Sequence, residues 1–224
     1  MTRTLLQIFE TTLGLSILST IAIACTAPQP TSNPSPQTSI DPIEHNPTEM
    51  NHAGMDHNLD LGPADENYDL RFIDAMIPHH EGAIIMAEDL MQKTKRPELQ
   101  KMAQDIIRTQ TQEIIQMKQW RKSWYSQIPN EPMAWHSSRN PMMPMSKSQQ
   151  EKMRMAVNLG TVDSGYDFRF LKAMIPHHEA AVRMSKDVMN KTKRPELKAI
   201  ANAIIQSQQR EIAQMRQWEI QWKK

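Results

Sequence analysis

Apolar residues recur alternately four and three positions apart over residues 69–93 and 167–191, and this spacing predicts two amphipathic helices. Each stretch carries one continuous apolar stripe with a histidine near its middle. The stripe residues are Phe72, Met76, His79, Ala83, Met86 and Leu90 in the first stretch, and Phe170, Met174, His177, Ala181, Met184 and Val188 in the second. A further helical pattern follows each stretch, over residues 97–124 and from residue 195 to near the C-terminus.

The two halves of this helical region are copies of one another. Residues 68–124 align without gaps with residues 166–222, and more than half of the aligned positions are identical. Each copy predicts a hairpin of two helices, and packing two hairpins together buries all four apolar stripes. The expected fold is therefore all-α, a four-helix bundle over residues 67–224, in which residues 125–160 form a crossing loop and a short helix over residues 147–159.

Prolines modify this picture at two kinds of position. Pro78 and Pro176 lie inside the first helix of each copy, where proline removes a backbone donor and presses on the preceding turn. They predict a kink, or a break and restart, just before the histidines. Pro97 and Pro195 instead suit the first position of the second helices.

The N-terminal 24 residues predict a cleavable signal peptide. An apolar run over residues 13–24 is too short to span a bilayer, and it ends in the small residues that precede a cleavage point. Cleavage there leaves Cys25 at the new N-terminus, so a lipid on this cysteine is an alternative outcome. The expected location is periplasmic or secreted in either case. Residues 25–66 are rich in Pro, Ser, Thr and Asn, which predicts a disordered tether.

Charge and cysteine content exclude several classes of function. The chain has 26 Lys and Arg against 25 Asp and Glu, so it has no net charge with which to hold nucleic acid. Its single cysteine allows neither a disulfide framework nor a cysteine-based metal site. Methionine, by contrast, is unusually frequent, with 18 among the 224 residues. The chain is therefore rich in thioether sulfur and poor in thiols.

Two histidine doublets, one in each copy, are the strongest candidates for chemistry. His79 and His177 lie on the apolar stripes and His80 and His178 flank them, with a methionine one turn before each doublet and another two turns after it. The candidate metal ligands of the bundle are His79, His80, His177, His178, Met76, Met86, Met174 and Met184. A packing role is the alternative, in which the methionines fill the core and the imidazoles are hydrogen-bonded by polar residues of the second helices. Those polar residues are Gln110, Glu113, Gln208 and Glu211.

Soft ligands recur outside the bundle, where no core competes for them. The tether and the crossing loop each hold a short run of Met and His. These candidates are Met50, His52, Met55 and His57 in the tether, and Met133, His136, Met142, Met143 and Met145 in the loop. Thioether sulfur suits Cu(I) and imidazole suits Cu(II) as well, so copper is the best match, with silver as a surrogate. Thioethers also stay available in an oxidising compartment, where thiols are consumed.

The sequences DAMIPHHEGA and KAMIPHHEAA, each followed by Q-x-x-E-I-x-x-M-x-x-W in the second helix, also carry a family resemblance. From Tyr68 to Trp222 the chain resembles a secreted helical family known as a domain of unknown function, whose signature is Met-Ile-Pro-His-His. The methionine-rich tether and loop of this chain make it most similar to the copper-binding members of that family. The resemblance implies a ferritin-like bundle, extracytoplasmic copper binding and a part in copper resistance, with Met76, His79, His80, Met174, His177 and His178 as the motif positions.

Two other classes of function stay open. A di-iron oxidase or oxygen carrier also uses a four-helix bundle, but it needs Glu-x-x-His pairs, and here Glu113 and Glu211 are followed at the third position by glutamine. A metal-free helical module that binds a sensor is the other. We expect copper ions as partners, no turnover, and no membrane contact except through a lipid on Cys25. Storage, sensing and transfer to an efflux system are alternatives that the residues do not separate.

Overall fold

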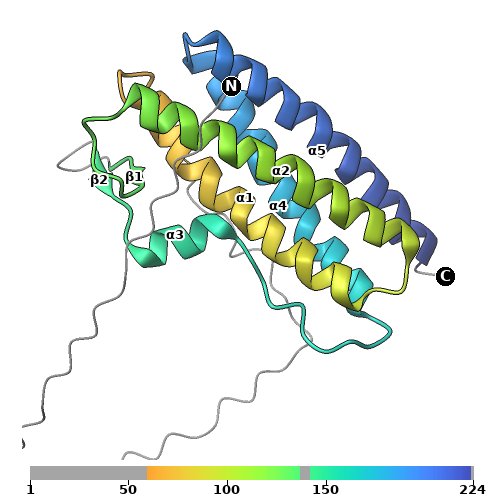
Figure 1. Ribbon diagram of the computed structural model, residues 1–224. Helices are drawn as coiled ribbons and strands as arrows, with labels where there is room; N and C mark the ends of the chain where they lie inside the picture. The colour runs from red at the N-terminus through yellow and green to blue at the C-terminus, as the bar shows by residue number, and fades with distance from the viewer. Residues whose placement is uncertain (1–59, 137–141, 223–224) are drawn as a thin grey trace, which may run out of the picture. The chain divides into compact units, whose positions relative to one another are not determined.

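The computed structural model describes residues 60–136 and 142–222, and these form a four-helix bundle (Figure 1). The first hairpin consists of α1 (Tyr68–Lys93) and α2 (Pro97–Trp124), and the second of α4 (Tyr166–Lys191) and α5 (Pro195–Trp222). Between them lie β1 (Met133–Ala134), β2 (Met143–Pro144) and the short helix α3 (Lys147–Arg154). The predicted all-α bundle of two repeated hairpins is thus confirmed. No helix of the described part is long and apolar enough to cross a membrane.

The prediction of a break at the internal prolines is wrong. Pro78 lies within the continuous helix α1, and Pro176 lies within α4. Proline removes one backbone hydrogen bond, but the apolar residues on both sides of it are buried in the bundle, and their packing holds the helix together. Pro97 and Pro195 begin α2 and α5, as predicted.

The bundle core is divided into two apolar clusters, one toward each end. The helices contact one another as the pairs α1 and α2, α4 and α5, and α1 and α4. One cluster joins the N-terminal half of α1 to the C-terminal half of α4, and the other joins the C-terminal half of α1 to the N-terminal half of α4. Each cluster also takes residues from α2 and α5. The middle of α1 and α4, where both histidine doublets lie, is therefore between the two apolar clusters.

Paired polar contacts join the two hairpins at these ends. The Tyr68 hydroxyl donates to Asp187 at 2.5 Å, and Tyr166 donates to Asp89 at the same distance. The corresponding arginines of the two interhelical turns stack on tryptophans of the opposite hairpin. Arg96 lies 4.0 Å from the ring centre of Trp222, and Arg194 lies 4.2 Å from that of Trp124. Each contact has a counterpart in the other copy, so the two hairpins are related by an approximate two-fold arrangement.

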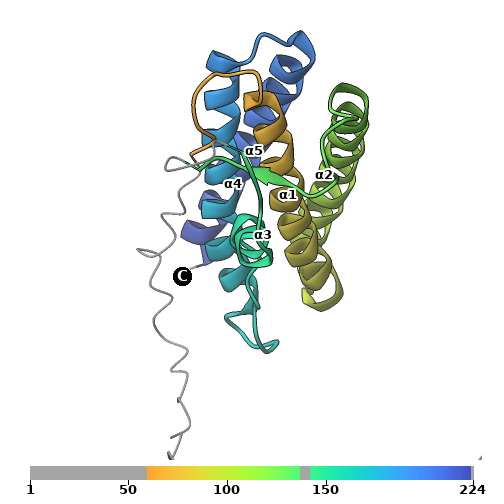
Figure 2. The same ribbon diagram turned by 90° about the vertical axis from the view of Figure 1, so that its left-hand side faces the viewer.

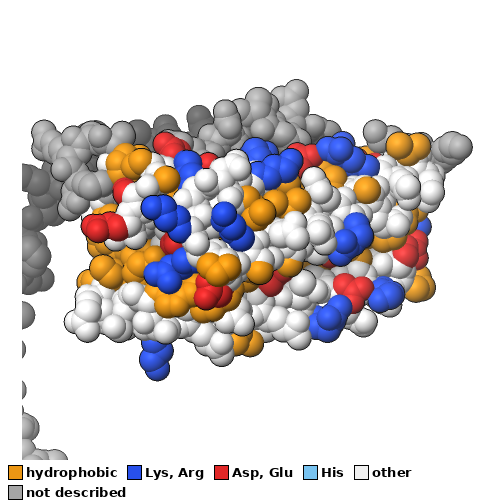
Figure 3. All heavy atoms as spheres, turned by 90° about the horizontal axis from the view of Figure 1, so that it is seen from above, with side chains coloured by type: hydrophobic (Ala, Val, Ile, Leu, Met, Phe, Trp, Pro, Cys, Tyr) orange, Lys and Arg blue, Asp and Glu red, His pale blue; other side chains and the backbone are white. Residues whose placement is uncertain are grey.

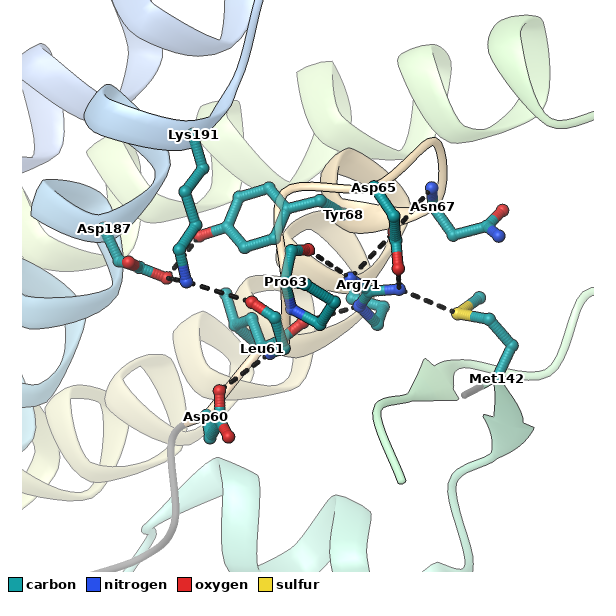
Figure 4. A network of polar contacts seen from close by, with 11 residues as sticks. Asp60, Leu61, Pro63, Asp65, Asn67, Tyr68, Arg71, Met142, Asp187 and Lys191 are labelled. Atoms are coloured by element: carbon teal, nitrogen blue, oxygen red, sulfur yellow. Dashed lines mark hydrogen bonds and ion pairs between the residues drawn. The ribbon is translucent and has the colours of Figure 1, made fainter. Parts of the chain in front are cut away.

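The segment of residues 60–66, which its polar composition places in the tether, is instead packed on the bundle. Arg71 is fully buried and donates to the main-chain oxygens of Leu61 at 2.5 Å and Pro63 at 2.8 Å (Figure 4). Its guanidinium also pairs with Asp65 at 2.9 Å. Arg169 binds residues 159–163 in the same way, with the Leu159 oxygen at 2.7 Å. The repeat therefore includes the segments that these two arginines bind, which precede the stretch of highest identity.

The crossing loop is fastened to α1 by one buried carboxylate. Asp74 accepts from Arg121 of α2 at 2.5 Å and from the Met133 amide at 2.8 Å. Helix α3 then begins at a capping box of Ser146 and Gln149. It ends at Arg154 and not near residue 159 as predicted, because Met155 adopts a left-handed conformation with φ of 49°. Helix α3 lies against α1, and its end reaches α4 of the second hairpin (Figure 2).

We expect Arg71→Met to destabilise the protein more than the matched change Arg169→Met. Arg71 is fully buried, whereas the Arg169 side chain is 29% exposed, so water can replace its lost contacts. Losing the contacts of the buried Arg71 guanidinium, which include the carbonyl of buried Leu61, costs about 3 kcal/mol, against about 1 kcal/mol at Arg169. Urea unfolding followed by circular dichroism measures both values. Equal losses in the two variants would contradict the role assigned to burial.

Candidate metal centre

The two histidine doublets meet where α1 packs against α4. All four imidazoles are buried, with relative exposures of at most 1%. The ring centres of His79 and His177 are 3.9 Å apart, and each ring lies just over 6 Å from its neighbour in the doublet. Among the described residues on the face drawn in Figure 3, no histidine reaches the surface. We call these four residues the histidine quartet.

Carboxylates of the second helices hold the outer imidazoles. Nε2 of His178 is hydrogen-bonded to Oε2 of Glu211 on α5 at 2.6 Å, whereas Nε2 of His80 lies 2.8 Å from Oε2 of Glu113 on α2 but not in hydrogen-bond geometry. Such contacts are expected of these glutamates whether or not a metal ion is bound, so they agree with the packing alternative as well as with a metal site. The structure does not assign the same role to Gln110 and Gln208, whose side chains are buried and whose Oε1 atoms have no partner in the described part.

The inner imidazoles are held differently from each other. Nε2 of His177 lies 2.9 Å from the main-chain oxygen of Arg154, the last residue of α3. Neither ring nitrogen of His79 has a hydrogen-bond partner among the described residues, and the Nδ1 atoms of His80, His177 and His178 have none either. Buried polar atoms without partners are uncommon in folded proteins and call for an explanation. Here they are ring nitrogens of the residue type that most often binds metals.

Burial keeps the inner imidazoles neutral. It lowers the pKa of His79 well below its usual value, and the neighbouring His177 and His80 lower it further. Burial likewise lowers the pKa of His177 to about 3, with a further contribution from His178, while the main-chain oxygens of Arg154 and His79 oppose the shift. Both rings are therefore neutral at physiological pH. A neutral imidazole has one nitrogen with a free lone pair, which is the form that binds a metal ion.

The donor set is limited in one respect. Among residues 60–136 and 142–222, no group of three or more His, Cys, Asp or Glu side chains is arranged to hold a metal ion. A zinc site or a di-iron carboxylate site would need such a group. A pair of neighbouring imidazoles therefore supplies two nitrogen donors. Sulfur ligands, or a rearrangement of side chains on binding, would complete a metal site.

The four candidate methionines of the bundle are all packed in the core. Met76 and Met184 belong to one apolar cluster, and Met86 and Met174 belong to the other. Each cluster thus takes one of these four methionines from each copy, on the two sides of the quartet. Their packing role is plain, because all four are at most 2% exposed.

The candidates of the crossing loop lie in different surroundings. Met133 and Met145 are buried, and Met145 joins the apolar cluster around Phe72. Sδ of Met142 lies 3.5 Å from Nη1 of Arg71 (Figure 4), and Met143 is 42% exposed. Nε2 of His136 lies 3.4 Å from the Gln149 side chain. Met50, His52, Met55 and His57 lie outside the described residues.

Two residues at the quartet were not found from the sequence. One is Arg154, whose main-chain oxygen reaches His177, and main-chain contacts leave no trace in side-chain patterns. The other is Gly82, against which Arg154 packs. The sequence does contain a difference that could have pointed to Gly82. The first copy reads HHEGA where the second reads HHEAA, with Ala180 in place of Gly82.

Comparison with known proteins finds solved structures that are similar to this chain and a shorter match to one sequence. CopM in its Cu(II)-bound form is 39% identical, with a TM-score of 0.56 over 69% of this chain and 97% of that one. The Cu(I)-bound form of CopM is 37% identical, with a TM-score of 0.51 over 69% of this chain and 96% of that one. A DUF305 fragment from Deinococcus radiodurans is 25% identical, with a TM-score of 0.53 over 69% of this chain and 96% of that one.

A shorter match is uncharacterized protein L153 of Acanthamoeba polyphaga mimivirus, 51% identical over 49 residues, or 22% of this chain. This chain spans about a third of the length of that relative, since the match covers 32% of it. The family described as "Domain of unknown function (DUF305)" matches residues 69–219, which include both helical hairpins and both histidine doublets. The chain therefore belongs to the DUF305 family.

Proposed function

We propose that this protein binds copper outside the cytoplasm and contributes to copper resistance or homeostasis. The observation that carries the proposal is the histidine quartet, whose buried imidazoles include ring nitrogens without hydrogen-bond partners in the described part. The inner two rings are neutral. The relatives support it, because CopM has been solved in Cu(I)-, Cu(II)- and Ag-bound forms and is similar over both hairpins. Copper is the cargo in this proposal, and no turnover is involved.

Within the bundle, the quartet supplies nitrogen ligands and the carboxylates behind it keep them in place. Glu211 is hydrogen-bonded to Nε2 of His178 and Glu113 lies close to Nε2 of His80, while Nδ1 of both rings has no hydrogen-bond partner in the described part. Carboxylates in this position fix the tautomer of a ligand and raise its basicity. Met76 and Met174 stand one helical turn before the doublets and are the sulfur donors that we assign to the site.

We assign the tether and loop residues to further copper sites, of which those around Met143 are the more accessible, since Met133 and Met145 are buried. Met143 is half-exposed, and Met142 and His136 lie on the same hairpin loop near the surface. Thioethers of this kind select Cu(I) and silver over zinc, magnesium or calcium. A signal peptide over residues 1–24 would bring these ligands to the periplasm or outside the cell, and a lipid on Cys25 would hold them at a membrane. A copper efflux system or a sensor is the partner class that fits such a chelator.

Removing the inner histidines is the main test. We expect the double variant His79→Gln, His177→Gln to bind its tightest Cu(I) ion at least about 100-fold more weakly, because outer partners alone change metal affinity by 10–100-fold. Competition with a Cu(I) chelator on the full mature chain measures the affinity. His136→Gln is the matched control, which should leave this tightest site unchanged. An unaltered affinity in a folded double variant would refute the assignment of the quartet.

A chain that begins at Asp60 separates the tether from the bundle. Residues 60–222 include the Leu61 and Pro63 oxygens that Arg71 needs, so the shortened chain keeps its N-terminal contact. We expect it to bind fewer Cu(I) ions than the full mature chain while its tightest site keeps the same affinity. Metal analysis after gel filtration gives the stoichiometry. An equal number of copper ions in both chains would remove the tether from the proposal.

The buried histidines also predict a pH dependence of stability. His79 and His177 are neutral when folded but titrate near 6.5 when unfolded, so below this pH the unfolded chain binds more protons. The free energy of unfolding should therefore fall by about 1.4 kcal/mol per pH unit for each histidine between about pH 6 and pH 4. Urea unfolding of the wild type and of His79→Gln, His177→Gln measures the difference in slope. Identical slopes would show that these rings are not neutral in the folded state.

A further inference from the structure

Helix α3 ends directly on the histidine quartet. The main-chain oxygen of Arg154, in the last turn of α3, lies 2.9 Å from Nε2 of His177. Carbonyl groups in the last turn of a helix lack internal partners and carry a partial negative charge, so they are good acceptors. Because an oxygen can only accept, Nε2 of His177 donates, and the ring proton is on Nε2. The free lone pair of His177 is then on Nδ1, which has no hydrogen-bond partner in the described part.

Only glycine at position 82 allows α3 to come this close. A Cβ atom at Gly82 would lie 1.8 Å from the Arg154 oxygen and 2.7 Å from its carbonyl carbon. Real Cβ contacts are never this short, so any side chain at position 82 would push the end of α3 away. The corresponding residue of the second copy is Ala180, which is fully buried. The contact is thus specific to one side of an otherwise duplicated site.

Further packing at the end of α3 comes from Met153, which lies against the apolar cluster around Phe72, and from Met155, which is buried. No side chain of α3 is buried. The Arg154 guanidinium lies 3.3 Å from Glu81 and also pairs with Glu151 of α3 itself. A charged cavity of about 540 Å³ lies beside this end of the helix, between α1, α2 and the crossing loop. The Arg154 oxygen reaches His177 because α3 packs closely against Gly82, and the cap at Ser146 supports the start of the same helix.

We propose that Gly82 and Arg154 are positioning residues for His177. The end of α3, seated on Gly82, holds the His177 ring with its proton on Nε2 and presents Nδ1 to a bound metal ion. His79 has no such support, since neither of its ring nitrogens has a partner in the described part. The two copies of the doublet are therefore not equivalent, and His177 is the preorganised ligand of the inner pair. The metal-binding step of this inference rests on the proposed function.

The exchanged pair Gly82→Ala and Ala180→Gly tests this on the full mature chain. Long-range ¹⁵N–¹H correlation spectra at pH 7 report the tautomer of each histidine without metal, and the His177 signals are identified by their loss in His177→Gln. We expect the wild type and Ala180→Gly to show His177 with its proton on Nε2. In Gly82→Ala we expect a mixture of both tautomers and faster exchange of the ring proton with water.

Affinity for Ag(I), used as a stable probe for Cu(I), is the second measurement on the same variants. Gly82→Ala should bind its tightest silver ion about 10–100-fold more weakly, which is the usual effect of losing a partner of a metal ligand. Ala180→Gly should stay within about twofold of the wild type, since the usual effect requires the loss of such a partner. Alanine forms helices better than glycine, so Gly82→Ala would raise the melting temperature if position 82 did not contact α3. Because α3 packs on Gly82, we expect Gly82→Ala to lower the melting temperature.

Ser146→Ala covers the case in which Gly82→Ala fails to fold. It removes the cap of α3 at an exposed position and should speed exchange of the His177 ring proton without changing the bundle. A His177 tautomer and exchange rate that stay the same in Gly82→Ala, or in Ser146→Ala if the former is unfolded, would overturn this inference. A wild-type chain that binds neither silver nor copper at the quartet would instead overturn the proposed function, whatever its tautomers.

Discussion

The meeting of four imidazoles between α1 and α4 is the constraint on which the rest of the structure depends. Every buried nitrogen without a partner costs about 1–3 kcal/mol, and the quartet contains several. Apolar side chains at the same positions would pack with less penalty. The two apolar clusters on either side supply the burial that offsets this cost, and they also remove the water that would otherwise satisfy or protonate the rings. The protein therefore keeps neutral nitrogen donors at its centre, at the expense of stability.

Duplication supplies the quartet, and differences between the copies make it asymmetric. One doublet would bury two imidazoles in a hairpin too small to enclose them, whereas two hairpins enclose all four. Tyrosine, arginine and tryptophan contacts then join the hairpins in matched pairs. The crossing loop breaks the match, because Asp74 binds it where the second copy has Lys172, and Gly82 seats α3 where the second copy has Ala180. One repeat thus became the support for an added element that reaches the shared site.

Methionine has two uses in this chain. In the bundle, Met76, Met86, Met174 and Met184 fill the core on both sides of the histidines, a role that suits a flexible and polarisable side chain. On the crossing loop the same residue type ranges from buried Met133 to half-exposed Met143. A thioether beside a buried imidazole and a thioether near solvent differ in how easily a metal ion reaches them. This difference suits a protein that captures soft ions near its surface and holds others in its interior.

The sequence by itself determined the elements, because helical periodicity and the gapless repeat are local and nearly unambiguous. It also placed His79, His80, His177 and His178 on inward-facing stripes, and Glu113 and Glu211 beside them, since helical spacing decides which residues share a face. It overestimated the effect of Pro78, because the cost of one lost backbone hydrogen bond is outweighed by packing that only the assembled bundle supplies. It placed residues 60–66 in the tether because their composition is polar, while their binding depends on a buried arginine further along. Only the tertiary structure decided which ring nitrogens are held and which are left without partners, because the deciding contacts are a main-chain oxygen and a missing Cβ atom brought together from distant parts of the chain.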